Sequence, residues 1–212
     1  MKTKAGLLLF PLLVSLSGCA SLRAGGDVAA GRRALLGGNN ETALAYFQNA
    51  AQIDPDYKYG SAYRQGILSY VGRTQYALGR LPQARETLQK ALAANKDEDI
   101  ARIYLGLTLA RSGDRPAGLK EIEGGMRGIN DFIEYITQAH RFSFGQFWDP
   151  AHEIRSAIQS DLAMISTREF DWQKLISDSE WVAKRMEEEG DKARNDEVRD
   201  RNRDSEGKDN SK

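Results

Sequence analysis

Apolar residues follow three different patterns along this chain. Residues 7–16 form a short, almost uninterrupted apolar run, and from Glu187 onward almost nothing is apolar. Between these ends, apolar residues recur every three or four positions, which is the spacing of one face of an α-helix. Two such stripes predict amphipathic helices late in the chain, and they consist of Ile154, Ile158, Leu162 and Ile165, and of Trp172, Ile176, Val182 and Met186.

The stretch from Gly66 to Phe132 repeats itself with a fixed period of 34 positions. The matching pairs are Gly72 and Gly106 (106 − 72), Gly79 and Gly113 (113 − 79), and Pro82 and Pro116 (116 − 82). A period of this size indicates a helical repeat, in which each unit is a helix pair that cannot bury its apolar face alone. Glycine suits the turn between the helices, and proline suits the first turn of the second helix.

Small and apolar positions inside each period match those of a known repeat. The second unit carries Ala84, Leu88 and Ala91 on its second helix, and the third unit carries Gly118, Ile122 and Gly125 at the corresponding places. Small residues at such positions let two helices approach closely. The stretch therefore resembles the tetratricopeptide repeat (TPR), whose period is 34 residues.

An earlier unit is displaced from this period. Ala43, Phe47 and Ala50 precede their counterparts in the second unit by 41 positions (84 − 43) instead of 34. Seven extra residues correspond to about two helical turns. We therefore expect the insertion, between residues 57 and 64, to lengthen a helix without rotating its buried face.

Glycines weaken the second helix of the third unit. Gly124, Gly125 and Gly128 each lower helix stability by up to about 1 kcal/mol relative to alanine. This composition predicts a short or mobile helix there.

The expected fold is all-α. Residues 27–132 are predicted to form a short α-solenoid of about three TPR helix pairs, and residues 133–190 to form helices that cap its open end. Within the cap, Asp149 and Pro150 suggest an N-cap followed by proline at the first helical position. The charged residues 191–212 are expected to be mostly disordered, although Glu188 with Lys192 and Glu197 with Arg201 have the spacing that supports an exposed helix.

The N-terminus has the features of a targeting signal. Two lysines precede the apolar run, which is too short to span a bilayer as a mature helix. Residues 16–19, Leu-Ser-Gly-Cys, resemble the lipobox of bacterial lipoproteins. The resemblance implies cleavage after residue 18, lipidation of Cys19, a linker over residues 19–26, and, because Ala20 follows the cysteine, the outer membrane. The alternative is an ordinary secretory signal in which the cysteine is incidental.

Composition and motifs argue against several kinds of chemistry. The 30 basic and 30 acidic residues balance, so no charge excess favours nucleic acid. One cysteine excludes an intramolecular disulfide, two histidines leave little material for a metal site, and no phosphate-binding loop is present, so no cofactor is expected. Asp149, His152 and Glu153 form the one cluster that resembles an acid–base or metal set. Their position at a predicted helix start explains them more simply, and a hydrolase remains the third and weakest alternative.

The resemblance therefore implies a non-catalytic, membrane-anchored scaffold that holds an envelope protein or peptide. TPR proteins bind such partners along a groove lined by their first helices. Carrying the groove-facing positions onto this chain selects Arg32, Arg73, Tyr76 and Arg111, although each arginine could instead be paired within the fold. The alternative is an accessory subunit of cell-wall or polysaccharide machinery that contacts its partner through the C-terminal helices.

Overall fold

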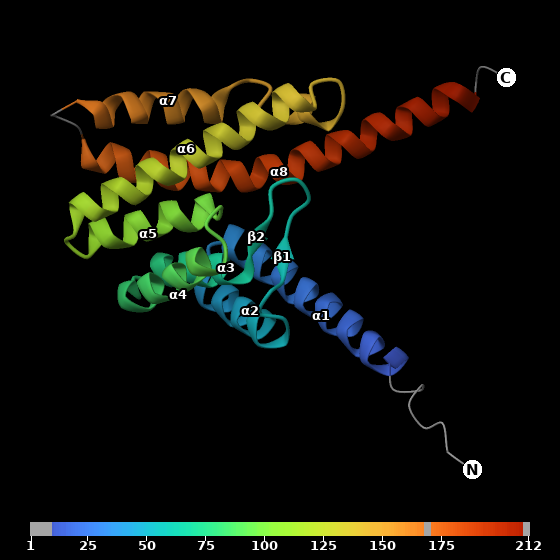
Figure 1. Ribbon diagram of the computed structural model, residues 1–212, viewed down its shortest axis with the longest axis horizontal. Helices are drawn as coiled ribbons and strands as arrows, with labels where there is room; N and C mark the ends of the chain where they lie inside the picture. Colours follow the sequence, from blue (N-terminus) through green and yellow to red (C-terminus); the bar gives the residue numbers. More distant parts are fainter. Residues whose placement is uncertain (1–9, 168–170, 210–212) are drawn as a thin grey trace, which may run out of the picture.

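The computed structural model describes residues 10–167 and 171–209 and confirms the all-α class. Figure 1 shows the helices stacked along the molecule, with one small hairpin between α2 and α3. The elements are α1 (Phe10–Leu36), α2 (Asn40–Ile53), β1 (Lys58–Tyr59), β2 (Gln65–Gly66), α3 (Ile67–Ala77), α4 (Leu81–Ala94), α5 (Asp99–Arg111), α6 (Arg115–Ala139), the 3₁₀ helix η1 (Phe144–Phe147), α7 (Glu153–Ser166) and α8 (Trp172–Asp209).

The first six helices form three pairs, α1–α2, α3–α4 and α5–α6, as the period predicted. The turns between paired helices contain Gly38, Gly79 and Gly113, whose φ angles are 76°, 72° and 99°. Glycine adopts this left-handed region at little cost, whereas other residues are strained there. The repeated glycines therefore end each first helix and set the position of the second.

Helix α6 contradicts the expectation of a short or mobile element, because it runs for 25 residues. Its glycines lie against α5. A Cβ atom on Gly125 would stand 2.7 Å from the carbonyl oxygen of Asp99, and one on Gly118 would stand 2.6 Å from that of Gly106. The glycines cost helix propensity, but they allow backbone-to-backbone packing that a side chain would prevent.

Two neighbouring glycines of α6 are therefore expected to respond in opposite directions to alanine. Gly125→Ala should destabilise the protein by about 1–3 kcal/mol, because the new methyl group meets backbone atoms of α5. Gly124→Ala meets only the flexible Arg102 side chain and should be neutral or stabilising by up to about 1 kcal/mol. Urea unfolding of both variants measures the difference. Equal effects at the two positions would show that propensity alone governs them.

The seven-residue insertion forms a β-hairpin, and the expectation of a longer helix is wrong. Strands β1 and β2 pair antiparallel, and Gly60 between them has a φ of 112°, which no α-helix contains. The Ile67 N–H then donates to the Tyr57 carbonyl across the base of the hairpin, at 3.0 Å. Aromatic contacts hold the hairpin on the array, since the Tyr63 and Phe132 rings lie 4.9 Å apart.

Both predicted irregular ends are helical where the structure describes them. The expected linker, residues 19–26, is part of α1, because Ala24 and Val28 are fully buried against the first repeat unit. At the other end α8 continues through residues 191–209, and Ala193 is still buried at 3% exposure. Ion pairs three residues apart, such as Arg194 with Asp191, also favour helix over disorder in this charged segment. Residues 210–212 lie outside the described part.

The last two long helices pack on the array. Ile154 and Ile158 of α7, and Leu175, Val182 and Met186 of α8, are fully buried and belong to the same apolar cluster as the core of α5 and α6. Figure 1 shows α8 running below α7 along the length of the molecule and crossing α6, and its last turns project beyond the other helices. A second apolar cluster holds α1, α2 and the start of α3 together. The apolar core is thus in two parts, and the buried apolar residues of α8 belong to the first.

Candidate functional site: the groove and the helix that lies in it

The four predicted groove residues lie on the first helices of the three pairs and face α8. Arg32 belongs to α1, Arg73 and Tyr76 to α3, and Arg111 is the last residue of α5. Arg32 and Arg73 are buried, at 8% and 5% exposure, and so is Tyr76 at 3%. The structure therefore brings the predicted residues to one surface, but α8 covers most of it.

Acidic residues of α8 hold the buried arginines. Glu187 binds both, with Arg73 Nη1 2.5 Å from Glu187 Oε2 and Arg32 Nε donating to Glu187 Oε1. Arg32 Nη2 also donates to Asp191, at 2.6 Å. Burial by itself raises the pKa of Glu187, but the two arginines outweigh it and hold the pKa below its ordinary value. Glu187 is therefore a carboxylate that two cations of the groove share.

Aromatic rings sit beneath the arginines of the groove. The guanidinium of Arg73 lies 4.5 Å from the centre of the Tyr70 ring, and that of Arg111 lies 4.7 Å from the centre of the Tyr76 ring. The Tyr76 hydroxyl donates to Glu180 Oε1 at 2.7 Å. Burial, followed by the contact with Glu180, raises the pKa of Tyr76, so the phenol stays protonated near neutral pH. Stacking of this kind fixes the planar guanidinium groups in one orientation.

Arg111 differs from the other two arginines. It is exposed, and within the described part of the chain no carboxylate lies within ion-pair distance of it. Arginine presents donors in a planar fork that matches a carboxylate. Of the three predicted arginines, Arg111 is thus the one whose charge the described residues leave available to a partner.

The three acidic partners were not identified from the sequence. Glu180, Glu187 and Asp191 are seven and four positions apart (187 − 180 and 191 − 187), which places them on one face of a helix. This spacing was the available signal. The scarcity of apolar residues after Glu187 indicates a solvated tail instead.

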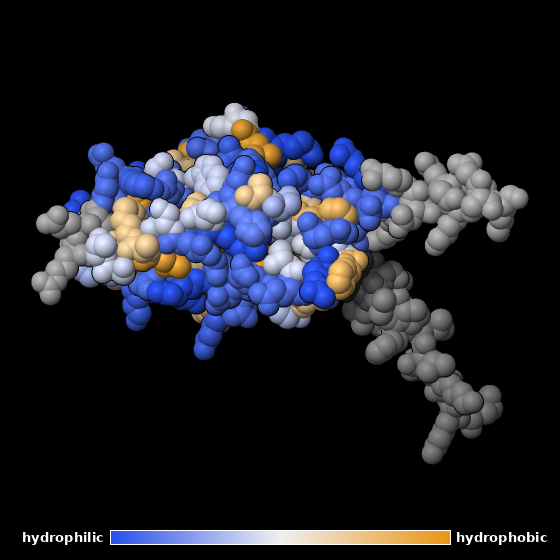
Figure 2. Space-filling model, turned by 90° about the horizontal axis from the view of Figure 1, so that it is seen from above, coloured by the Kyte–Doolittle hydropathy of each residue, from blue (hydrophilic) through white to orange (hydrophobic). Residues whose placement is uncertain are grey.

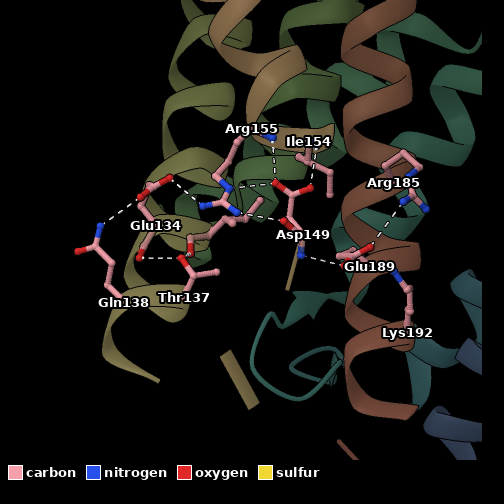
Figure 3. A network of polar contacts seen from close by, with 10 residues as sticks. Glu134, Thr137, Gln138, Asp149, Ile154, Arg155, Arg185, Glu189 and Lys192 are labelled. Carbon is pink, nitrogen blue, oxygen red and sulfur yellow. Dashed lines mark hydrogen bonds and ion pairs between the residues drawn. The ribbon is translucent and has the colours of Figure 1, made fainter. Parts of the chain in front are cut away.

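Asp149 has a structural role at the junction of α6, α7 and α8, as Figure 3 shows. Its carboxylate accepts from the backbone N–H groups of Ile154 and Arg155, at 3.0 and 3.2 Å, and from Arg155 Nε at 3.0 Å. Arg155 also donates to Glu134 of α6 at 3.1 Å, while the Asp149 N–H donates to Glu189 of α8 at 2.8 Å. Asp149 does cap a helix, but α7 begins at Glu153 and not, as predicted, at Pro150.

The cluster considered for a hydrolase does not converge on one point. Asp149 is buried at 3% exposure with its oxygens engaged, whereas His152 and Glu153 are exposed. Glu153 instead lies 3.3 Å from Arg185 of α8. Within the described residues no group of three His, Cys, Asp or Glu side chains could hold a metal ion. The geometry of these three residues is that of a helix junction.

The N-terminal segment is described only in part. Cys19 lies within the backbone of α1, and its side chain is outside the described part, so lipidation stays a prediction. Among the described residues, no helix combines the length and the apolar character needed to cross a membrane.

Comparison with known proteins supports the resemblance of the array to a known repeat family. Residues 34–107 match the family described as tetratricopeptide repeat, a stretch that runs from the end of α1 into α5. A search of curated proteins finds no match. Repeats of this family generally mediate protein–protein interaction. The matched stretch contains Arg73, Tyr76 and the turn at Gly79, and it includes all of α2, α3 and α4, so this part of the array is similar to the tetratricopeptide repeat.

Proposed function

We propose that this protein is a non-catalytic scaffold that holds another protein of the bacterial envelope close to a membrane. The observation that carries the proposal is the repeat array, whose first helices bring Arg73, Tyr76 and Arg111 to one surface. Because α8 pairs with Arg32 and Arg73, the partner contacts the part of the groove around Tyr76 and Arg111.

The membrane anchor in this proposal is Cys19, on the strength of the lipobox resemblance. Arg32 lies thirteen positions after Cys19 (32 − 19), and both are within the single helix α1. At 1.5 Å per residue this distance is about 20 Å. A lipid at Cys19 would therefore keep the groove near the bilayer surface, within reach of membrane-bound partners on the periplasmic side of the outer membrane.

Crosslinking in cells followed by membrane fractionation tests the proposal. The wild-type chain should sediment with the outer membrane and yield a defined crosslinked envelope protein, and mass spectrometry should find acyl chains on an N-terminal Cys19. Cys19→Ser should release the chain from the membrane fraction, and Arg111→Gln should reduce the crosslink. A wild-type chain with an unmodified Cys19, or one that captures no envelope protein, would contradict the proposal.

One observation favours the second candidate function, an accessory subunit that contacts cell-wall or polysaccharide machinery through its C-terminal helices. Tyr135 and Phe142, near the end of α6, are 65% and 85% exposed. Deleting residues 142–190 would not test this, because it removes the buried face of α8. Replacing Tyr135 and Phe142 by serine in the crosslinking experiment does, since loss of the crosslink there, with Arg111→Gln unaffected, would favour the second function.

A further inference from the structure

An aspartate without a hydrogen-bond donor is buried where α7 packs on α8. Asp161, in the second half of α7, is 0% exposed, and neither of its carboxylate oxygens has a hydrogen-bond partner among the described residues. Ile158 and Leu162, on the same side of the helix, belong to the apolar packing of α7 on the core. Burying an ionised carboxylate without donors is costly, so such a group takes up a proton more readily.

A second carboxylate and one ammonium group lie beside Asp161 on α8. Lys174 Nζ is 3.7 Å from Asp161 Oδ1, beyond hydrogen-bond distance, and the same ammonium group pairs with the Asp178 carboxylate. The Lys174 side chain is half exposed, so water screens its charge, whereas Asp161 has no access to water. Two carboxylates therefore share one partly solvated cation, which leaves one negative charge in excess (2 − 1).

Helix α6 also packs on α7, but no salt bridge or hydrogen bond joins it to Asp161 within the described residues. Several charged side chains of α6 have other contacts: Glu121 pairs with Arg102, Glu123 with Arg127, Glu134 with Arg155, and Arg115 lies over the Trp172 ring. The charged contacts of Asp161 in the part of the chain that the structure describes therefore come from α8.

These surroundings favour the protonated form of Asp161. Burial, followed by the contact with Asp178, raises the pKa of Asp161 to about 7, and Lys174 offsets only part of this. The pKa of an aspartate in the unfolded chain is about 3.9. Between these two values the folded chain holds a proton that the unfolded chain has released, so the contact weakens as the pH rises from about 4, and the weakening is complete above about 7.

We propose that Asp161 and Asp178 form a pH-sensitive switch, which holds the second half of α7 against α8 when Asp161 is protonated and releases it when Asp161 is ionised. The protonated carboxyl group donates its O–H to Asp178. When the proton leaves to solvent, two carboxylates face each other across the helix contact and repel. The first half of α7 stays in place, because Asp149 and Arg155 hold it. The inference does not depend on the proposed function.

Release of the second half of α7 would expose apolar surface on a face that is otherwise hydrophilic. Helix α7 lies along the upper edge of the molecule in Figure 1, the side from which Figure 2 is viewed, and there hydrophilic residues cover most of the surface, with apolar residues in small separate groups. Leu162 and Ile165 of α7 pack on the core. The switch therefore increases the apolar surface that this face offers to a partner as the pH rises toward 8.

Hydrogen exchange of the backbone amides of the full chain, measured at pH 5.5 and pH 8, tests the proposal. Dividing each rate by the intrinsic rate at the same pH gives the local opening equilibrium. Residues 161–166 should open at least about tenfold more often at pH 8, because each pH unit between the two pKa values changes the equilibrium by up to tenfold. The amides of α4, which lies in the array, should change much less.

Variants assign the effect to the two carboxylates. Asp161→Asn should remove the pH dependence, because an amide group donates to Asp178 at every pH. Lys174→Gln should move the midpoint to higher pH, because Lys174 favours the ionised form of Asp161. Glu153→Gln is the control and should leave the pH dependence unchanged, since Glu153 is an exposed carboxylate of α7 that pairs with Arg185.

Titration of the Asp161 carboxyl carbon by NMR in the wild-type chain gives a readout that needs no variant to fold. Its midpoint should lie near pH 7. A midpoint below about pH 5 would overturn the proposal, and so would an Asp161→Asn variant with the pH dependence of the wild type. Opening of residues 161–166 that is the same at both pH values, or that changes only as much as the opening of α4, would also overturn it.

Discussion

Replacing Glu187 by glutamine is expected to destabilise the protein by about 3–5 kcal/mol, because two buried arginines lose the carboxylate that they share. Arg73 is 5% exposed and Arg32 is 8% exposed, so water replaces the lost partner only in part. Arg32 keeps Asp191, but Arg73 keeps no ion-pair partner among the described residues. Urea unfolding at pH 7, followed by circular dichroism, measures the change.

Glu188→Gln is the matched control for this variant. Glu188 is the next residue of α8, its side chain is 36% exposed, and it pairs with Lys184 and Arg185 at the surface. Removing its charge should cost less than about 1 kcal/mol. If Glu187→Gln and Glu188→Gln lower the free energy of unfolding by similar amounts, burial does not make the Arg32–Glu187–Arg73 group more stabilising than a surface ion pair.

The same group makes stability depend on pH in a defined direction. The pKa of Glu187 is lower in the folded chain than in the unfolded chain, so the unfolded chain takes up the proton first. The stabilisation by Glu187 is therefore complete above the pKa of glutamate in the unfolded chain, which is about 4.3. It is lost as the pH falls through the lower pKa of Glu187 in the folded chain. The difference between wild type and Glu187→Gln should accordingly shrink below about pH 4.

Asp149→Asn is expected to cost about 2–4 kcal/mol, because an amide cannot accept from all the donors that now surround the carboxylate. The Ile154 and Arg155 N–H groups at the start of α7 lose part of their cap, and the amide NH₂ faces the Arg155 side chain. Hydrogen exchange of the Ile154 and Arg155 amides should accelerate more than that of residues in α4. Urea unfolding gives the global effect.

Glu153→Gln serves as the control for Asp149→Asn. Its side chain is 57% exposed and pairs with Arg185, so the change should cost less than about 1 kcal/mol. Unchanged exchange at Ile154 and Arg155 in Asp149→Asn would show that the carboxylate is not what caps α7. It would also reopen the question of what Asp149 does.

Much of the array could be predicted from the sequence. The 34-residue period, the turn glycines and the packing of Ala84 and Leu88 are local features, because each repeat unit forms from residues close together in the chain. Gly79 and Gly113 have the positive φ angles that their place in the period suggested. The glycines of α6 were misjudged, since helix propensity does not show that their missing side chains admit the backbone of α5.

The hairpin was also beyond the sequence pattern. Seven residues are about two helical turns, so an insertion of this length preserves the buried helix faces on either side of it, whether it lengthens a helix or forms a hairpin. Its length alone therefore does not distinguish a longer helix from a hairpin. Gly60 and the contact of Tyr63 with Phe132 decide it, and the second depends on where α6 lies.

The sequence by itself determined the class of the fold, the helix pairs and the first helices that carry Arg32, Arg73, Tyr76 and Arg111. Only the tertiary structure decided which of these residues remain available to bind a partner. Arg32 and Glu187 are 155 positions apart, and no periodic pattern links them. Their pairing depends on the path of α8, which the burial of Leu175, Val182 and Met186 in the core fixes. Because that packing places Glu187 between Arg32 and Arg73, the groove is filled there and open at Arg111.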